Sequence, residues 1–85
     1  MSNLTIWKYP FSIAYAFMLE MPKGAVVICV QVQAGVPTLW AEVNPSNQTE
    51  YVRFRIVGTG HLLPLGQYLG TFQQPPFVWH LYQVG

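Results

Sequence analysis

Apolar and polar residues alternate along much of this chain with a period of two, which is the period of a β-strand. The segment 26–33 has valine or isoleucine at its even positions, whereas the opposite face begins apolar and ends in glutamines. The segments 38–44 and 51–57 alternate in the same way, and the second of them carries Arg53 and Arg55 on its polar face. Short turn-forming stretches separate these segments, so we expect three consecutive strands that pair as an antiparallel meander.

The remaining apolar segments predict further strands towards both ends of the chain. These segments cover residues 4–9, 15–21, 67–73 and 77–84. Segment 15–21 could also form a short helix, but the turn residues directly after it favour a strand. No segment carries a helical apolar stripe over three turns. We therefore expect a single all-β domain over residues 1–85, a small antiparallel sandwich or partly open barrel of about six to seven strands.

The composition predicts that part of the surface is covered. Only 8% of the 85 residues are charged and 52% are hydrophobic, whereas an ordinary soluble domain has about 25% charged residues. We expect a homo-oligomer or a bound partner, because large exposed apolar patches are unfavourable on a monomer. The alternative is a compact monomer with a surface of glutamine, asparagine, threonine and tyrosine. The candidate interface residues are the aromatic side chains Trp7, Tyr9, Phe11 and Tyr15.

The charge pattern excludes a large class of partners. Four basic residues and a formal net charge of +1 are too few cations for the many phosphate contacts that duplex nucleic acid requires. One or two arginines are nevertheless enough for a small anion. The longest apolar run, residues 13–19, is far shorter than the roughly 20 residues that span a bilayer. We therefore expect no membrane association.

Metal binding, cofactor binding and catalysis are not expected. Cys29 is the only cysteine and the only histidines are His61 and His80, so a metal site would lack ligands. A lone cysteine also fits a reducing cytosol. The chain has no aspartate, and its three glutamates lie in separate segments. His61 near Thr59 would be the best general base, but this pair does not define a reaction.

The segment Gly58–His61 is the most unusual motif, because two glycines and a histidine directly follow the arginine-bearing strand. No helix is expected after it and Pro64 follows closely, so it is neither a dinucleotide-binding loop nor a P-loop. Two interpretations remain open. The glycines either bend the chain at a corner or β-bulge, or they let backbone amides approach a phosphate.

The second interpretation leads to the hypothesis of a nucleotide-like ligand. The two arginines would bind phosphate, the glycine turn would donate backbone N–H groups, and Trp40 on a neighbouring strand would stack on a base. A histidine from the turn or from the last strand would add a donor. In the alternative, Trp40 packs beneath a loop and the arginines pair with Glu42 and Glu50 across strands. The candidate ligand-binding residues are Trp40, Arg53, Arg55, Gly58, Thr59, Gly60, His61 and His80.

Short motifs are spread over nearly the whole chain. They are Trp7-Lys8-Tyr9-Pro10, Gly24-Ala25, Val30-Gln31-Val32-Gln33, Leu39-Trp40-Ala41, Phe54-Arg55-Ile56-Val57-Gly58-Thr59-Gly60-His61, Tyr68-Leu69-Gly70-Thr71-Phe72 and Val78-Trp79-His80. Together they resemble a family of small bacteriophage and prophage proteins that forms a domain of unknown function. The resemblance implies a phage origin and an intracellular setting, but it transfers no catalytic residue. Residues 11–17 are more apolar than the family pattern, which indicates a local apolar interface.

These observations predict a small phage-encoded binding protein that acts in the host cytoplasm and is not an enzyme. We expect it to inhibit a host defence system, either by binding a host protein or by sequestering a small anionic nucleotide signal. The alternative is a structural or assembly component of the phage particle, since a compact β domain that oligomerises also fits that role.

Overall fold

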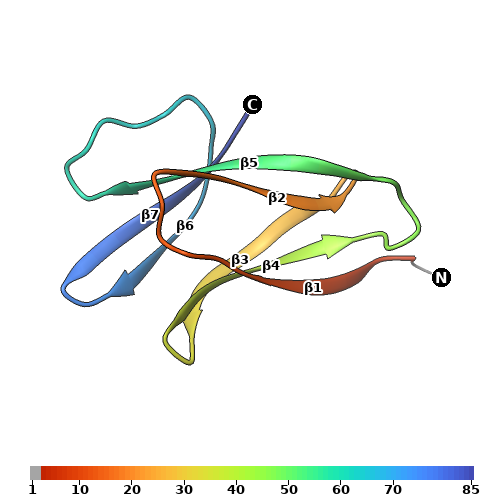
Figure 1. Cartoon of the computed structure of the whole chain (residues 1–85), viewed down its shortest axis with the longest axis horizontal. Coiled ribbons are helices and arrows are strands. Elements are labelled where there is room, and N and C mark those ends of the chain that lie inside the picture. The colour runs from red at the N-terminus through yellow and green to blue at the C-terminus, as the bar shows by residue number, and fades with distance from the viewer. Residues whose placement is uncertain (1–2) are drawn as a thin grey trace.

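The structure is a computed structural model that describes residues 3–85 as seven strands in two antiparallel sheets (Figure 1). The strands are β1 (Thr5–Pro10), β2 (Ala16–Pro22), β3 (Val26–Gln33), β4 (Val36–Val43), β5 (Thr49–Gly58), β6 (Gln67–Gln74) and β7 (Phe77–Val84). The three-stranded sheet has the order β1-β4-β3, and the four-stranded sheet has the order β2-β5-β7-β6. The predicted all-β sandwich is confirmed, and the sheets do not close into a barrel. Residues 3–85 include no helix that could span a membrane.

The predicted meander of three consecutive strands is only partly correct. β3 and β4 pair as a hairpin, with Gln33 opposite Val36, but β5 pairs with β2 and β7 in the other sheet. β1 already occupies the second side of β4, so β4 has no free edge for β5. The connection 44–48 carries the chain between the sheets, and its Gln48 carbonyl accepts a 2.8 Å hydrogen bond from the Lys23 N–H.

The inward faces of the two sheets form one hydrophobic core, because every second side chain of a strand points between the sheets. Leu39, Phe54 and Leu81 are fully buried there. Phe17 stacks between Phe11 and Phe54, at ring-centroid distances of 5.0 and 5.1 Å. Phe11 is only 7% exposed, so its side chain belongs to the core instead of the interface predicted for it.

A close approach of β3 and β6 joins the two sheets along one side. A Cβ atom on Gly70 would lie 3.2 Å from the Cβ atom of Val30, so glycine allows the two strands to touch. The pairing of β6 with β7 shifts by one residue between Tyr68 and Gly70. This β-bulge puts Tyr68 and Thr71 on the same, outward face of the four-stranded sheet.

Candidate functional site

The outward face of the four-stranded sheet brings together most of the candidate ligand-binding residues. Arg55 lies opposite Tyr82, and His80 lies opposite Val57 on one side and Thr71 on the other. Because side chains alternate along a strand, both arginines of β5 share this face with His80. We call it the outer face, and it includes Met18, Arg53, Arg55, Tyr68, Thr71, His80, Tyr82 and Val84.

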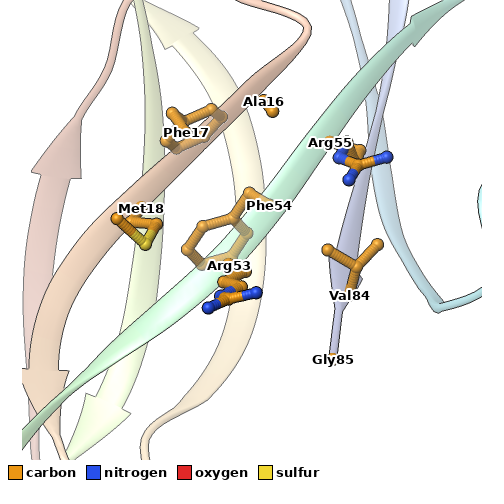
Figure 2. Close-up of a pocket in the computed structure, with 8 residues that line it drawn as sticks. All are labelled: Ala16, Phe17, Met18, Arg53, Phe54, Arg55, Val84 and Gly85. Carbon is orange, nitrogen blue, oxygen red and sulfur yellow. The ribbon is translucent and has the colours of Figure 1, made fainter.

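An open groove of ≈ 430 Å³ lies around the two arginines on the outer face (Figure 2). Arg53 and Arg55 are two residues apart on β5, so their Cα atoms are about 7 Å apart along the strand. Met18 of β2 and Val84 of β7 both lie opposite Arg53. The groove therefore combines two cations with apolar walls, an arrangement that suits a ligand with an anionic group and an apolar part. It is lined by Ala16, Phe17, Met18, Arg53, Phe54, Arg55, Val84 and Gly85.

The guanidinium group of Arg55 is held by an aromatic residue. Its Cζ atom lies 5.0 Å from the centroid of the Tyr15 ring, and its Nη1 atom donates a 3.3 Å hydrogen bond to the Tyr15 hydroxyl. Tyr15 is itself anchored, since its carbonyl accepts a 3.0 Å hydrogen bond from the Ile56 N–H. The side chain of Arg53 is exposed and makes no hydrogen bond or ion pair within residues 3–85. One arginine is thus oriented in advance, and the other is free to reach a ligand.

Both ring nitrogens of His80 are hydrogen-bonded to threonine hydroxyls. Nε2 lies 2.9 Å from Thr59 Oγ1, and Nδ1 lies 2.8 Å from Thr71 Oγ1. Thr71 is also hydrogen-bonded to the hydroxyl of Tyr68, whose ring packs edge-on against Tyr82. A neutral imidazole has one donor and one acceptor, and a hydroxyl can complement either. This network therefore ties the turn after β5 to β6 and β7.

The segment Gly58–His61 is a type II β-turn. The His61 N–H donates a 3.1 Å hydrogen bond to the Gly58 carbonyl. Gly60 has a φ angle of 92°, which is the conformation that the third residue of this turn requires. A Cβ atom on Gly58 would lie 3.2 Å from the His61 ring. Chain geometry therefore accounts for both glycines, as the corner interpretation predicted, and their contact with a phosphate stays a prediction.

His61 and His80 lie on different surfaces. His61 lines a second pocket, of ≈ 250 Å³, together with Trp79, which points to the side of β7 opposite to His80. The two histidines therefore do not share a site. Within residues 3–85, no three His, Cys, Asp or Glu side chains gather closely enough to hold a metal ion.

Residues 2–85 match the family model of DUF7352, which is described as a domain of unknown function. The chain belongs to the DUF7352 family. This finding confirms the resemblance to a family of unknown function, whereas the phage origin stays a prediction. No curated protein and no solved structure matches the chain. The matched range includes all seven strands, so the groove, the His80 network and the turn all lie within the DUF7352 domain.

Trp40 lies on the other sheet of this DUF7352 domain. It is opposite Cys29 in the three-stranded sheet and borders a shallow outward pocket with Ile6 and Ile28. The prediction that Trp40 stacks on a base held by the two arginines is therefore wrong, because β5 crosses to the four-stranded sheet. Glu42 is on the same strand as Trp40, so it does not pair with the arginines either.

The four aromatic residues predicted to form an interface lie in different environments of the DUF7352 domain. Trp7 is exposed, whereas Phe11 is in the core. Tyr9 points to the core side of β1, and its hydroxyl has no hydrogen-bond partner among residues 3–85. Burial raises the pKa of the Tyr9 hydroxyl. Tyr15 is exposed and holds Arg55, so of these four only Trp7 and Tyr15 offer a partner substantial exposed area.

The sequence patterns did not predict that several further side chains belong to the outer face of the DUF7352 domain. The contact of Tyr15 with Arg55 depends on the pairing of β2 with β5, for which no local motif exists. Tyr68 and Thr71 are three residues apart, so a strict period of two would put them on opposite faces. Gly70 within the strand is the one local signal for the β-bulge that brings them together.

Proposed function

We propose that this DUF7352 protein is a binding protein whose outer-face groove holds a small nucleotide-like ligand by its phosphate. The observation that supports this proposal best is the pair of arginines on one face, with Arg55 oriented by Tyr15. Guanidinium groups form strong, often bidentate hydrogen bonds with phosphate. A side chain that is already oriented loses less freedom when it binds.

The apolar walls of the groove support a ligand that also carries a base. Met18 and Val84 flank Arg53 on the two neighbouring strands, and the polarizable thioether of methionine makes favourable contacts with aromatic rings. The groove volume of ≈ 430 Å³ lies within the range of about 300–1,000 Å³ that is usual for small-molecule sites. A base against Met18 would place its phosphate within reach of the arginines.

We further propose that the protein is phage-encoded and sequesters a defence signal nucleotide in the host cytoplasm. The support is the resemblance of its motifs to small phage proteins. Sequestration needs a binding site but no catalytic group, which agrees with a groove lined by two arginines and mostly apolar side chains.

Calorimetric titration with a panel of nucleoside monophosphates and cyclic dinucleotides tests the nucleotide ligand. Arg53→Ala and Arg55→Ala are each expected to weaken binding about 10- to 100-fold, the loss expected for hydrogen bonds to a charged group. Lys23→Ala removes a cation from the exposed turn after β2 and should leave the affinity unchanged. If no phosphorylated probe binds, the proposal of a nucleotide ligand is refuted. If Lys23→Ala loses as much affinity as the arginine variants, the groove is not the binding site.

A host protein is the second candidate partner, and exposed tyrosines around the outer face favour it. Tyr15, Tyr51 and Tyr68 are all exposed, and tyrosine and arginine are enriched at the energetic centres of protein interfaces. The arginines would then contact acidic residues of the partner. Affinity capture from host lysate tests this version, which predicts one host protein retained by the wild-type chain and lost with the Arg53→Ala, Arg55→Ala double variant.

A further inference from the structure

The loop between β5 and β6 exposes three leucines. Leu62 and Leu65 are 95% and 96% exposed, and Leu63 is 66% exposed. Figure 1 shows this loop extending away from both sheets beyond the end of β5. We call residues 59–66 the leucine loop. Apolar side chains gathered on the surface in this way mark an interaction site.

The leucine loop is held at both ends. At its start, the type II turn and the 2.9 Å hydrogen bond between Thr59 and His80 fix the loop to β7. At its end, Gly66 lies so close to β7 that a Cβ atom there would be 2.4 Å from the Gln83 carbonyl oxygen. Glycine is therefore required at this contact. The leucines are thus displayed by a loop that specific contacts hold at both ends.

An apolar pocket of ≈ 250 Å³ lies at the same corner of the molecule. His61 lines this pocket and directly precedes Leu62, so the pocket and the leucine loop are adjacent. Among residues 3–85, no Lys, Arg, Asp or Glu side chain lines the pocket. Its lining residues are Ile13, Ala14, Tyr15, Ile56, His61 and Trp79.

We propose that two copies of the chain associate at this corner, with Leu62 of each copy inserted into the apolar pocket of the other. A twofold dimer uses the same patch on both copies, so the patch must contain both a projecting group and its receptor. The leucine loop and the adjacent pocket satisfy this condition. With the twofold axis beside His61, both contacts form at once and the leucines of both copies are covered.

The charge distribution favours a second copy as the occupant. Residues 56–85 contain no Lys, Arg, Asp or Glu. Arg55, which contacts the pocket residue Tyr15, is held by the ring and hydroxyl of that tyrosine. Two such corners therefore bring few charges together. A lipid surface fits less well, because apolar segments that bind membranes are usually accompanied by basic residues that contact anionic headgroups.

Such a dimer would cover a modest share of the surface of the chain. A stable interface covers about 800 Å² on each partner, which is about one seventh of the 5607 Å² surface of this chain. Exposed Ile13 and Tyr15 lie beside the leucine loop at the pocket. These residues and the three leucines supply the apolar centre that an interface requires.

Sedimentation velocity of the purified chain tests the dimer. The wild-type chain is expected to have about twice the 9.6 kDa mass of one copy, and the Leu62→Ser, Leu65→Ser variant is expected to be monomeric. Both leucines are almost fully exposed, so circular dichroism should show an unchanged fold. Ile6→Ser is the matched control, because Ile6 is an exposed apolar residue of the three-stranded sheet, and this variant should remain dimeric.

A pocket variant makes the test independent of the loop. Ala14→Glu places a charge in the pocket lining and is expected to give monomers. A mixture of the pocket and loop variants restores one of the two contacts, so it should form a mixed dimer that is weaker than the wild-type dimer. A wild-type monomer at every soluble concentration, or a dimer that survives both variants, would overturn the proposal. Loop-dependent binding of a monomeric wild-type chain to phosphatidylserine vesicles would also overturn it.

Discussion

The guanidinium group of Arg55 lies 5.0 Å from the centre of the Tyr15 ring and donates a hydrogen bond to the Tyr15 hydroxyl. This contact joins the connection before β2 to the arginine-bearing strand β5. Tyr15 also lines the apolar pocket at the corner of the molecule. The same residue thus orients a cation of the candidate ligand site and borders the proposed dimer contact.

The contribution of Tyr15 can be separated into its ring and its hydroxyl. Tyr15→Ala removes both contacts with Arg55, whereas Tyr15→Phe removes only the hydrogen bond. We expect Tyr15→Ala to weaken binding of the phosphorylated ligand about 2- to 5-fold, since an exposed cation–π contact contributes about 0.5–1 kcal/mol. Tyr15→Phe should lose less affinity in the same titration. Equal losses in the two variants would show that the ring face does not orient Arg55.

The His80 network should stabilise the fold measurably. His80→Ala breaks the hydrogen bonds to Thr59 and Thr71, and we expect the free energy of unfolding in urea to fall by about 1–2 kcal/mol. Thr59→Val breaks one of these bonds and should have about half the effect. Thr59→Ser keeps the hydroxyl and serves as the control. Unchanged stability of Thr59→Val would show that the hydrogen bond between Thr59 and His80 does not stabilise the fold.

The turn after β5 should tolerate few residues at position 60. A Cβ atom on Gly60 would meet no other atom of residues 3–85 within 4 Å, so only the positive φ angle penalises a substitution there. We expect Gly60→Ala to lower the free energy of unfolding by about 1–2 kcal/mol. Gly60→Asn should lower it less, because asparagine adopts positive φ angles more readily. Urea unfolding of the two variants compares these costs, and equal stability of Gly60→Ala and the wild-type chain would contradict the turn assignment.

Removal of the Tyr9 hydroxyl should not destabilise the protein. This buried hydroxyl has no hydrogen-bond partner within the described residues 3–85, and an unsatisfied buried polar group costs about 1–3 kcal/mol. We therefore expect Tyr9→Phe to leave the free energy of unfolding unchanged or to raise it by up to about 1 kcal/mol. Tyr51→Phe, which removes an exposed hydroxyl, is the control. A clear loss of stability in Tyr9→Phe alone would reveal a partner for the hydroxyl.

Tyr9 also predicts a pH dependence of stability. Burial raises the pKa of its hydroxyl above the ordinary value of 10.0, so the folded chain keeps this proton at a pH at which the unfolded chain releases it. The contribution of the protonated Tyr9 hydroxyl to the free energy of unfolding is fully present below about pH 10. It is lost as the pH rises through the raised pKa. Above pH 10, urea unfolding should therefore show a steeper loss of stability in the wild-type chain than in Tyr9→Phe.

Local patterns were sufficient to predict most of the strands and part of the candidate site. The alternation over residues 51–57 places Arg53 and Arg55 on one face, because the two-residue period of a strand depends only on the backbone. The same reasoning failed for Tyr68 and Thr71, since a β-bulge breaks the period between them. The pairing of β5 also escaped prediction, because several orders of antiparallel strands agree with the same alternation.

The amino-acid pattern therefore established an all-β domain with paired arginines on a polar strand face and a glycine corner after that strand. Tertiary structure decided which side chains surround them. The crossing of β5 to the four-stranded sheet separates Trp40 from the arginines and brings Tyr15 to Arg55, forty positions apart in the chain. It also assembles the His80 network from three segments. The physical reason is that the strand period is a property of neighbouring residues, whereas the partner of each strand depends on packing between residues that are distant in the sequence.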